Sequence, residues 1–150
     1  MKPQQEQAET LVYRHCLPIQ IRFNDVDQYG HVNNNAYFSY YDLGKEDYLR
    51  RVLKVDYRKH NVVPVIANIN ADFIFPIFYG DPVVVETCVS RLGQKSFTLE
   101  QRIVNERTGA EMSRCATVMV CFSLVDQLSA DMPEHYRDAI KAFESGEAKL

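Results

Sequence analysis

The chain has 150 residues and a formal net charge of −3, and 46% of its residues are hydrophobic. This length and composition predict one globular domain, and the lack of a net positive charge argues against binding to nucleic acid or to an acidic membrane surface. No apolar run approaches the roughly 20 residues that a membrane-spanning helix needs. Residues 1–9 lack the apolar core of a signal peptide and are expected to be frayed.

The four cysteines and four histidines are scattered along the chain. No two cysteines form a Cys-x-x-Cys pair, and no group of these residues has the spacing of a metal site. We therefore expect reduced thiols, no metal, and a cytoplasmic protein.

The first apolar pattern, at residues 13–23, alternates with a period of two and predicts a half-buried strand, in which Pro18 indicates an edge position or a bulge. A polar turn follows, and then a helix of about five turns is predicted by apolar residues at spacings of four and three. One face of this helix comprises Tyr37, Tyr41, Gly44, Tyr48 and Val52. A glycine in the middle of this face indicates close contact between helix and sheet.

Four more alternating segments follow the helix, at residues 63–75, 83–89, 97–103 and 112–122, and most are joined by short turns. Pro133 is expected at the first position of a short C-terminal helix whose apolar face comprises Tyr136, Ile140 and Phe143. This order predicts an α+β fold in which a five-stranded antiparallel sheet wraps around one long helix.

The turn before the long helix is dense in polar side chains: Asp25, Asp27, His31, and the three asparagines at 33–35. A helix N-terminus offers backbone N–H groups without intrahelical partners and a partial positive charge. A carboxylate beside that end can face a carbonyl group that these N–H groups polarise. The arrangement suits acyl-transfer chemistry.

Residues 25–37 read Asp-Val-Asp-Gln-Tyr-Gly-His-Val-Asn-Asn-Asn-Ala-Tyr. They resemble the motif Asp-x-Asp-x-x-Gly-His-Val-Asn-Asn-x-x-Tyr of the hotdog-fold acyl thioesterases of the 4-hydroxybenzoyl-CoA thioesterase type, and the order of elements over residues 15–125 matches as well. The resemblance implies a single hotdog domain over residues 1–150, and a homodimer or homotetramer with joined sheets and active sites at the subunit interface. It also implies an enzyme that hydrolyses acyl-CoA, with coenzyme A as part of the substrate and no other cofactor.

In this family, the carboxylate that matches Asp27 acts as nucleophile or general base. We expect backbone N–H groups at the start of the helix, near residues 33–35, to hold the oxyanion. The structural alternative for Asp27 is to cap the turn or the helix. His31 matches a catalytic histidine in the Asn-x-His-Val-Asn-Asn motif of some acyl-carrier-protein thioesterases, but Tyr29 replaces the first asparagine, and His31 could equally order the loop. Asn33 and Asn34 could bind the acyl carbonyl or cap the helix.

Asp25 is interpreted as a structural residue that holds the turn. Residues 91–98 resemble the family's hairpin near the nucleotide of coenzyme A, where Lys95 and Ser96 match; a solvated hairpin is the alternative. Tyr37 is expected to contact the substrate. The absence of a Gly-x-Ser-x-Gly motif argues against a serine hydrolase.

Two other functions stay open at this stage. The substrate could be a thioester on an acyl carrier protein, or the chain could be a hotdog module that binds acyl thioesters without hydrolysing them. The tyrosines of the helix allow an aryl or a fatty acyl group and do not choose between them.

Overall fold

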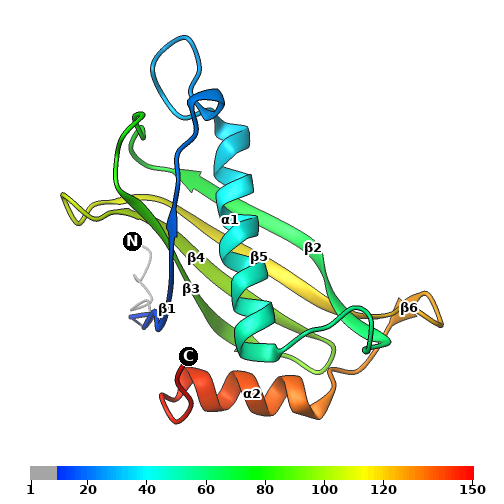
Figure 1. Cartoon of the computed structure of the whole chain (residues 1–150). Helices are drawn as coiled ribbons and strands as arrows, with labels where there is room; N and C mark the ends of the chain where they lie inside the picture. The colour runs from blue at the N-terminus through cyan, green and yellow to red at the C-terminus, as the bar shows by residue number, and fades with distance from the viewer. Residues whose placement is uncertain (1–9) are drawn as a thin grey trace, which may run out of the picture.

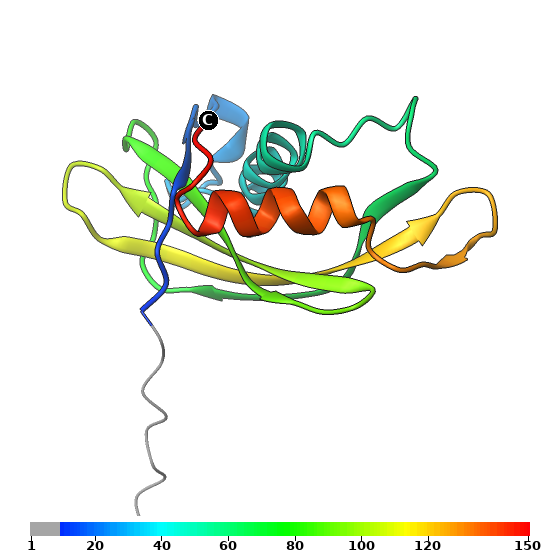
Figure 2. The same ribbon diagram turned by 90° about the horizontal axis from the view of Figure 1, so that it is seen from below.

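The computed structural model describes residues 10–150, so the expected fraying of residues 1–9 lies outside the described residues. A curled antiparallel sheet carries a long helix, α1 (Asn34–Tyr48), on its concave face, and a second helix, α2 (Glu134–Glu144), covers one end (Figures 1 and 2). A π-helical turn at Leu49–Leu53 extends α1, and a 3₁₀ turn at Phe23–Asp25 precedes it. The strands are β1 (His15–Ile19), β2 (Val62–Phe73), β3 (Val83–Leu92), β4 (Ser96–Asn105), β5 (Glu111–Ser123) and β6 (Leu128–Ser129).

The strands form one sheet in the order β1-β3-β4-β5-β2, with β6 paired to β5, and each of these pairs is antiparallel. The expected sheet wrapped around one helix is confirmed. The expected count of five strands is corrected to six, because β6 has only two residues and gives no alternating pattern. The first strand ends at Ile19 rather than residue 23, since the chain turns at Phe23–Asp25.

Both β1 and β2 lie at an edge of the main sheet. Pro18 therefore lies in an edge strand, where its missing N–H breaks no ladder bond in the interior. In β2 the predicted strand is confirmed, and three of its apolar side chains are well exposed: Val65, Ile66 and Ile69 are 38%, 45% and 38% exposed. A long apolar edge of this kind is a surface on which another strand can pair.

Helix α1 approaches the sheet closely at Gly44, as expected. A Cβ atom at this position would lie 2.6 Å from Cγ1 of Val85 and 3.1 Å from Nε2 of Gln101, so no side chain fits. The predicted aromatic face is buried, and Tyr41 and Tyr48 are 1% and 0% exposed.

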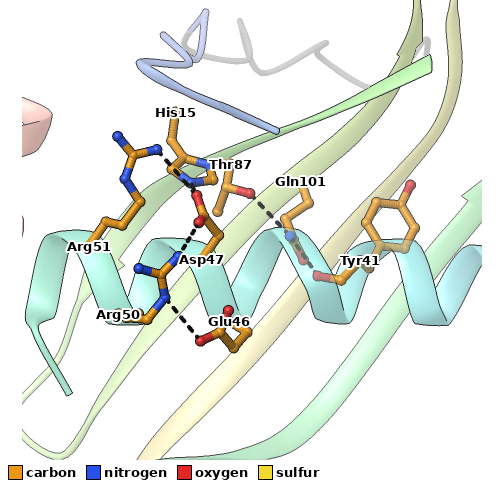
Figure 3. Close-up of polar contacts among 8 residues, drawn as sticks. All are labelled: His15, Tyr41, Glu46, Asp47, Arg50, Arg51, Thr87 and Gln101. Carbon is orange, nitrogen blue, oxygen red and sulfur yellow. Dashed lines mark hydrogen bonds and ion pairs between the residues drawn. The ribbon is translucent and has the colours of Figure 1, made fainter. Parts of the chain in front are cut away.

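The interior under α1 consists of two apolar clusters, one around Tyr37 and Tyr41 and one around Tyr48. Between them lies a buried polar belt, which we define as His15, Asp47, Thr87 and Gln101 (Figure 3). Within it, Nε2 of Gln101 donates to the backbone oxygen of Tyr41 (3.0 Å) and to Oγ1 of Thr87 (3.1 Å). These bonds tie the middle of α1 to strands β3 and β4.

Helix α2 closes the second cluster with its expected apolar face of Tyr136, Ile140 and Phe143. Pro133 occupies the N-cap position, one residue earlier than predicted. Oε1 of Glu144 accepts hydrogen bonds from the Tyr48 hydroxyl (2.5 Å) and from the backbone N–H of Val89 (2.8 Å). The end of α2 is thereby fixed to both α1 and β3.

Cys16, Cys88, Cys115 and Cys121 are free thiols. Within residues 10–150, no three His, Cys, Asp or Glu side chains are grouped in a way that could hold a metal ion. In the same part of the chain, no helix combines the length and the apolar composition needed to cross a bilayer.

Candidate active site at the start of helix α1

The polar turn is closed by backbone hydrogen bonds just before α1. The N–H of Asp27 donates to the oxygen of His31 (2.9 Å), and the N–H of Gly30 donates to the oxygen of Asp27 (3.0 Å). Gly30 has a φ of 80°, a left-handed conformation that favours glycine. The N–H of Val32 donates to the oxygen of Ile77 (2.8 Å), which attaches the turn to the segment before β3.

Asp25 holds this turn, as expected. Its Oδ2 accepts hydrogen bonds from the Tyr40 hydroxyl (2.7 Å) and from the backbone N–H of Arg22 (2.9 Å). Its backbone oxygen accepts from the N–H of Asn33 (2.7 Å). Asp25 therefore connects both sides of the turn to α1, and its carboxylate is occupied by structural bonds.

Asp27 is half-buried at the outer end of the turn. Its Oδ1 accepts a hydrogen bond from the backbone N–H of Tyr29 (2.9 Å), which is the turn-capping contact that the structural alternative requires. Within the described residues, Oδ2 has no hydrogen-bond partner. The carboxylate is thus held in place by one oxygen and keeps the other for a further contact.

Asn33 is the N-cap of α1, and its Oδ1 accepts from the N–H of Asn35 (2.9 Å). The side chain of Asn33 is therefore engaged in capping. Residues 10–150 supply no acceptor for the backbone N–H of Asn34. That donor lies in the first turn, where the partial positive charge of the helix is concentrated.

His31 packs against an aromatic ring. Its imidazole lies edge-to-face on Phe78, with 5.0 Å between ring centroids, and the two backbones form an isolated antiparallel bridge. No side-chain hydrogen bond of His31 is found within the described part of the chain. These contacts order the loop, which was one of the two roles considered from the sequence.

Tyr37 is buried beneath a small aromatic group that the sequence reasoning did not assign to the site. The Tyr37 ring lies edge-to-face on the Phe73 ring, with 5.0 Å between the ring centroids. The Phe38 ring also lies edge-to-face on Phe73, with 6.2 Å between the centroids. Burial raises the pKa of the Tyr37 hydroxyl, so this group stays neutral. Phe38, Phe73 and Phe78 are 38%, 44% and 47% exposed, and they present apolar surface beside the polar turn. The signal for this group was the aromatic-rich run at residues 73–79.

A polar hollow of about 360 Å³ opens over the first turn of α1, and it is lined by Asn24, Asp25, Asn33, Asn35, Ala36 and Ser39. Asp27 does not line it. The side chains that converge here are amides, one carboxylate and one hydroxyl, which can hold polar parts of a ligand.

Lys95 and Ser96 lie far from Asp27 within one chain. They belong to the hairpin between β3 and β4, whereas the turn that holds Asp27 is attached through Val32 to Ile77, just before β3 begins; Figure 1 shows that hairpin and the start of α1 at opposite ends of the sheet. The ten residues of β3 separate the two ends by roughly 33 Å. A single chain therefore does not bring the predicted coenzyme A contacts to the predicted catalytic carboxylate.

Residues 21–140 match the model of the family described as the Thioesterase-like superfamily. The long-chain acyl-CoA thioesterase FadM of Escherichia coli (strain K12) is 26% identical over 124 residues, which cover 82% of this chain and 94% of FadM. A protein of Pseudomonas aeruginosa strain PAO1 has a similar structure, with a TM-score of 0.80, 27% identity, and coverage of 87% of this chain and 91% of that one. A thioesterase of Thermus thermophilus, solved with coenzyme A and Zn, gives a TM-score of 0.76 at 29% identity and covers 89% of this chain and 96% of that one.

The family match includes the motif at residues 25–37, the whole of α1 and the strands β2 to β5, whereas β1 lies just before the matched residues. The curled sheet around one long helix agrees with the structural neighbours. The resemblance drawn from the sequence is thus confirmed at the level of fold and of enzyme class. The chain belongs to the Thioesterase-like superfamily and is a hotdog-fold thioester hydrolase.

Proposed function

We propose that the protein hydrolyses acyl-CoA thioesters to a carboxylic acid and free coenzyme A. The observation that carries this proposal is the position of Asp27, a carboxylate with one unengaged oxygen in the turn that leads directly to the unpaired N–H of Asn34. An attacking oxygen and an oxyanion donor are the two requirements for opening a thioester carbonyl. FadM, a relative with 26% identity, is named as an acyl-CoA thioesterase, which supports the choice of substrate class.

In the proposed reaction, Asp27 takes a proton from water while the water oxygen attacks the thioester carbon. Negative charge develops on the carbonyl oxygen, and the N–H of Asn34 at the positive end of α1 stabilises it. The carbon–sulfur bond then breaks, and the coenzyme A thiolate leaves and takes up a proton. Direct attack by the Asp27 carboxylate, followed by hydrolysis of the anhydride, is the second route that the same geometry permits. Coenzyme A enters as part of the substrate, and neither route requires a further cofactor.

We propose that the working unit is a homodimer formed through β2. Antiparallel pairing of two β2 strands would place the Val62 end of one strand beside the Phe73 end of the other. The Lys95 hairpin lies toward the Val62 end, since Ser96 pairs with Val120 and Val120 pairs with Val65. The start of α1 lies at the Phe73 end. Pairing would thus bring Lys95 and Ser96 of the partner subunit toward Asp27.

Within this dimer, Lys95 of the partner subunit would meet a phosphate of coenzyme A as a point charge. The exposed rings of Phe38, Phe73 and Phe78 would contact the acyl group. A tetramer built from two such dimers is compatible with this site. We place the enzyme in the cytoplasm, because its four thiols are free and three of them are buried.

The test is thiol release from a panel of short, long and aromatic acyl-CoA esters by the wild type and by Asp27→Asn. Asparagine can still accept the hydrogen bond from Tyr29, so this variant removes the charge and keeps the turn. Asp56→Asn is the matched control, because Oδ1 of Asp56 accepts from the N–H of Arg58 at 2.9 Å in the same type of turn. We expect a loss of at least about 10²-fold in kcat for Asp27→Asn and wild-type turnover for Asp56→Asn.

Full turnover by Asp27→Asn would contradict the proposed mechanism. Hydrolysis of thioesters on acyl carrier protein, with no activity on any CoA ester, would assign the second substrate class. Tight acyl-CoA binding by the wild type without thiol release from either carrier would make the domain a binding module.

A further inference from the structure

A second cavity lies at the opposite end of α1 from Asp27. It has a volume of about 370 Å³ and lies between the end of the π-helical turn, the connector that follows it, α2 and residues 148–150. The twenty residues of α1 and the π-helical turn place it roughly 30 Å from the polar turn. The proposed reaction makes no use of this cavity.

The rim of this cavity is basic although the chain as a whole is acidic. Its cationic or imidazole side chains are Arg51, Lys54, His60, His135 and Lys149, and no Asp or Glu side chain lines it. The net charge of the chain is −3. Basic residues near a helix C-terminus often offset the negative end of the helix, which accounts for Arg51 and Lys54. His60, His135 and Lys149 come from three other segments, and the helix end does not account for them.

Two of the rim side chains are held in position. Nη1 of Arg51 donates to Oδ2 of Asp47 at 3.4 Å, so the guanidinium is anchored on one side (Figure 3). Nδ1 of His60 accepts from the backbone N–H of Asp56 (3.1 Å), so in the neutral ring Nε2 carries the proton and is a donor. Lys54 adopts a φ of 56°, a conformation that is uncommon for a residue with a side chain. Arg51 and His60 are therefore fixed donors at the rim, and the exposed side chains of Lys54 and Lys149 add charge beside them.

The floor of the cavity is apolar. It comprises Val52, Leu53, Ala139, Ala142 and Phe143, of which Val52, Leu53 and Phe143 belong to the buried core. A volume of about 370 Å³ lies at the small end of the range for ligand pockets, which fits one hydrocarbon chain better than a nucleotide. An apolar floor below a cationic rim is complementary to an amphipathic anion.

We propose that this cavity binds a medium-chain fatty carboxylate, with the carboxylate at the rim of Arg51, Lys54 and Lys149 and the hydrocarbon chain on the floor. The site is separate from the candidate active site, and its occupancy does not depend on Asp27. It would give the enzyme a site, apart from the one that releases the carboxylic acid, at which a free fatty acid binds.

Histidine NMR gives a test in which the two sites report separately. The chain has four histidines: His60 and His135 lie at the cavity, His31 lies in the polar turn, and His15 is buried. We would titrate decanoate into the full chain and into Asp27→Asn, and follow the imidazole signals. We expect saturable shifts at His60 and His135 in both proteins. Decanol, the uncharged analogue, should bind at least about tenfold more weakly than decanoate.

Lys54→Glu/Lys149→Glu should weaken decanoate binding by about tenfold or more, because two attractive charges become repulsive. Arg58→Glu, an exposed residue outside the cavity, is the matched control and should bind as the wild type does. Shifts confined to His31, equal binding of decanol, or tighter binding of adenosine 3′,5′-bisphosphate at His60 and His135 would overturn the proposal. Loss of hydrolysis in Asp27→Asn with retained shifts would leave both proposals standing, and retained hydrolysis would overturn only the first.

Discussion

The imidazole of His15 on β1 is wholly buried and donates through Nε2 to Oδ2 of Asp47 on α1, at 2.7 Å (Figure 3). Nδ1 has no partner within the described residues, so a protonated ring would bury an N–H group without an acceptor. Desolvation accordingly lowers the pKa of His15, and the bond to Asp47 opposes this only in part. The pKa of Asp47 is also lowered: burial alone would raise it, but His15 and Arg51 favour the carboxylate.

The first prediction concerns stability and pH. Because the pKa of His15 is lower in the folded chain than in the unfolded chain, the unfolded chain binds the proton first as pH falls. The contribution of neutral His15 to the free energy of unfolding is complete above its unfolded pKa of about 6.5, and it is lost as the pH falls below that value. We would measure urea unfolding at about pH 8 and about pH 5.5. Between these two pH values, the free energy of unfolding should fall more for the wild type than for His15→Gln, whose amide can still donate to Asp47. Equal losses in the two proteins would assign the effect to other groups.

The second prediction concerns Gly44. Replacing glycine by alanine inside an exposed helix usually stabilises it by about 1 kcal/mol. At Gly44 the sign should reverse, because the new methyl group would lie 2.6 Å from Val85 Cγ1. We expect Gly44→Ala to lower the free energy of unfolding by about 1–3 kcal/mol. Ser39→Ala, on the exposed face of the same helix, is the control and should change it little. Unchanged stability in Gly44→Ala would mean that the sheet gives way easily here.

A third prediction separates the two roles of Asn33. Removal of the cap in Asn33→Ala should cost about 1 kcal/mol of unfolding free energy, and it should weaken thiol release if the first turn frays. Asn33→Ser restores a capping oxygen without the amide. We expect it to recover both stability and turnover. If stability returned while kcat stayed low, the Asn33 amide would have to contact the substrate.

The fourth prediction tests the proposed subunit arrangement. Asp27→Asn and Lys95→Glu should each weaken hydrolysis of acyl-CoA in homodimers. In a mixed dimer, one site would combine Asp27 from one chain with Lys95 from the other, and the second site would carry both substitutions. Unfolding and refolding the two variants together should therefore restore activity, because each mixed dimer would contain one site with both wild-type residues. Mixtures no more active than the separate variants would contradict the proposed pairing of subunits through β2.

The parts of the fold that depend on local pattern could be predicted from the sequence. Alternation identified β3, β4 and β5, because each of these strands has one face on the core. The recurrence of Tyr37, Tyr41 and Tyr48 identified the buried face of α1. Alternation also identified β2, but it could not reveal that this strand lies at an edge of the sheet with several apolar side chains exposed. Whether an apolar strand is covered depends on its neighbours, and these are absent from a local pattern.

The candidate site shows the same division. The motif at residues 25–37 predicted that Asp25, Asp27 and the N-terminus of α1 would lie together, because they are close in sequence. It could not reveal that Asn34, rather than Asn33, presents the unengaged N–H, since this depends on which side chain caps the helix. Nor could it reveal that Lys95 lies at the far end of β3, because that distance follows from the sheet as a whole.

The buried polar belt has a mechanical consequence. It lies between the apolar contacts beneath the start of α1 and those beneath its end, and we expect the two groups to open at different free energies. Cooperative units of this kind open at different free energies within one domain. We therefore expect the end of the molecule that carries Asp27 to open more readily, as the entry of a substrate would require, while the end that Glu144 fixes to Tyr48 and Val89 stays folded.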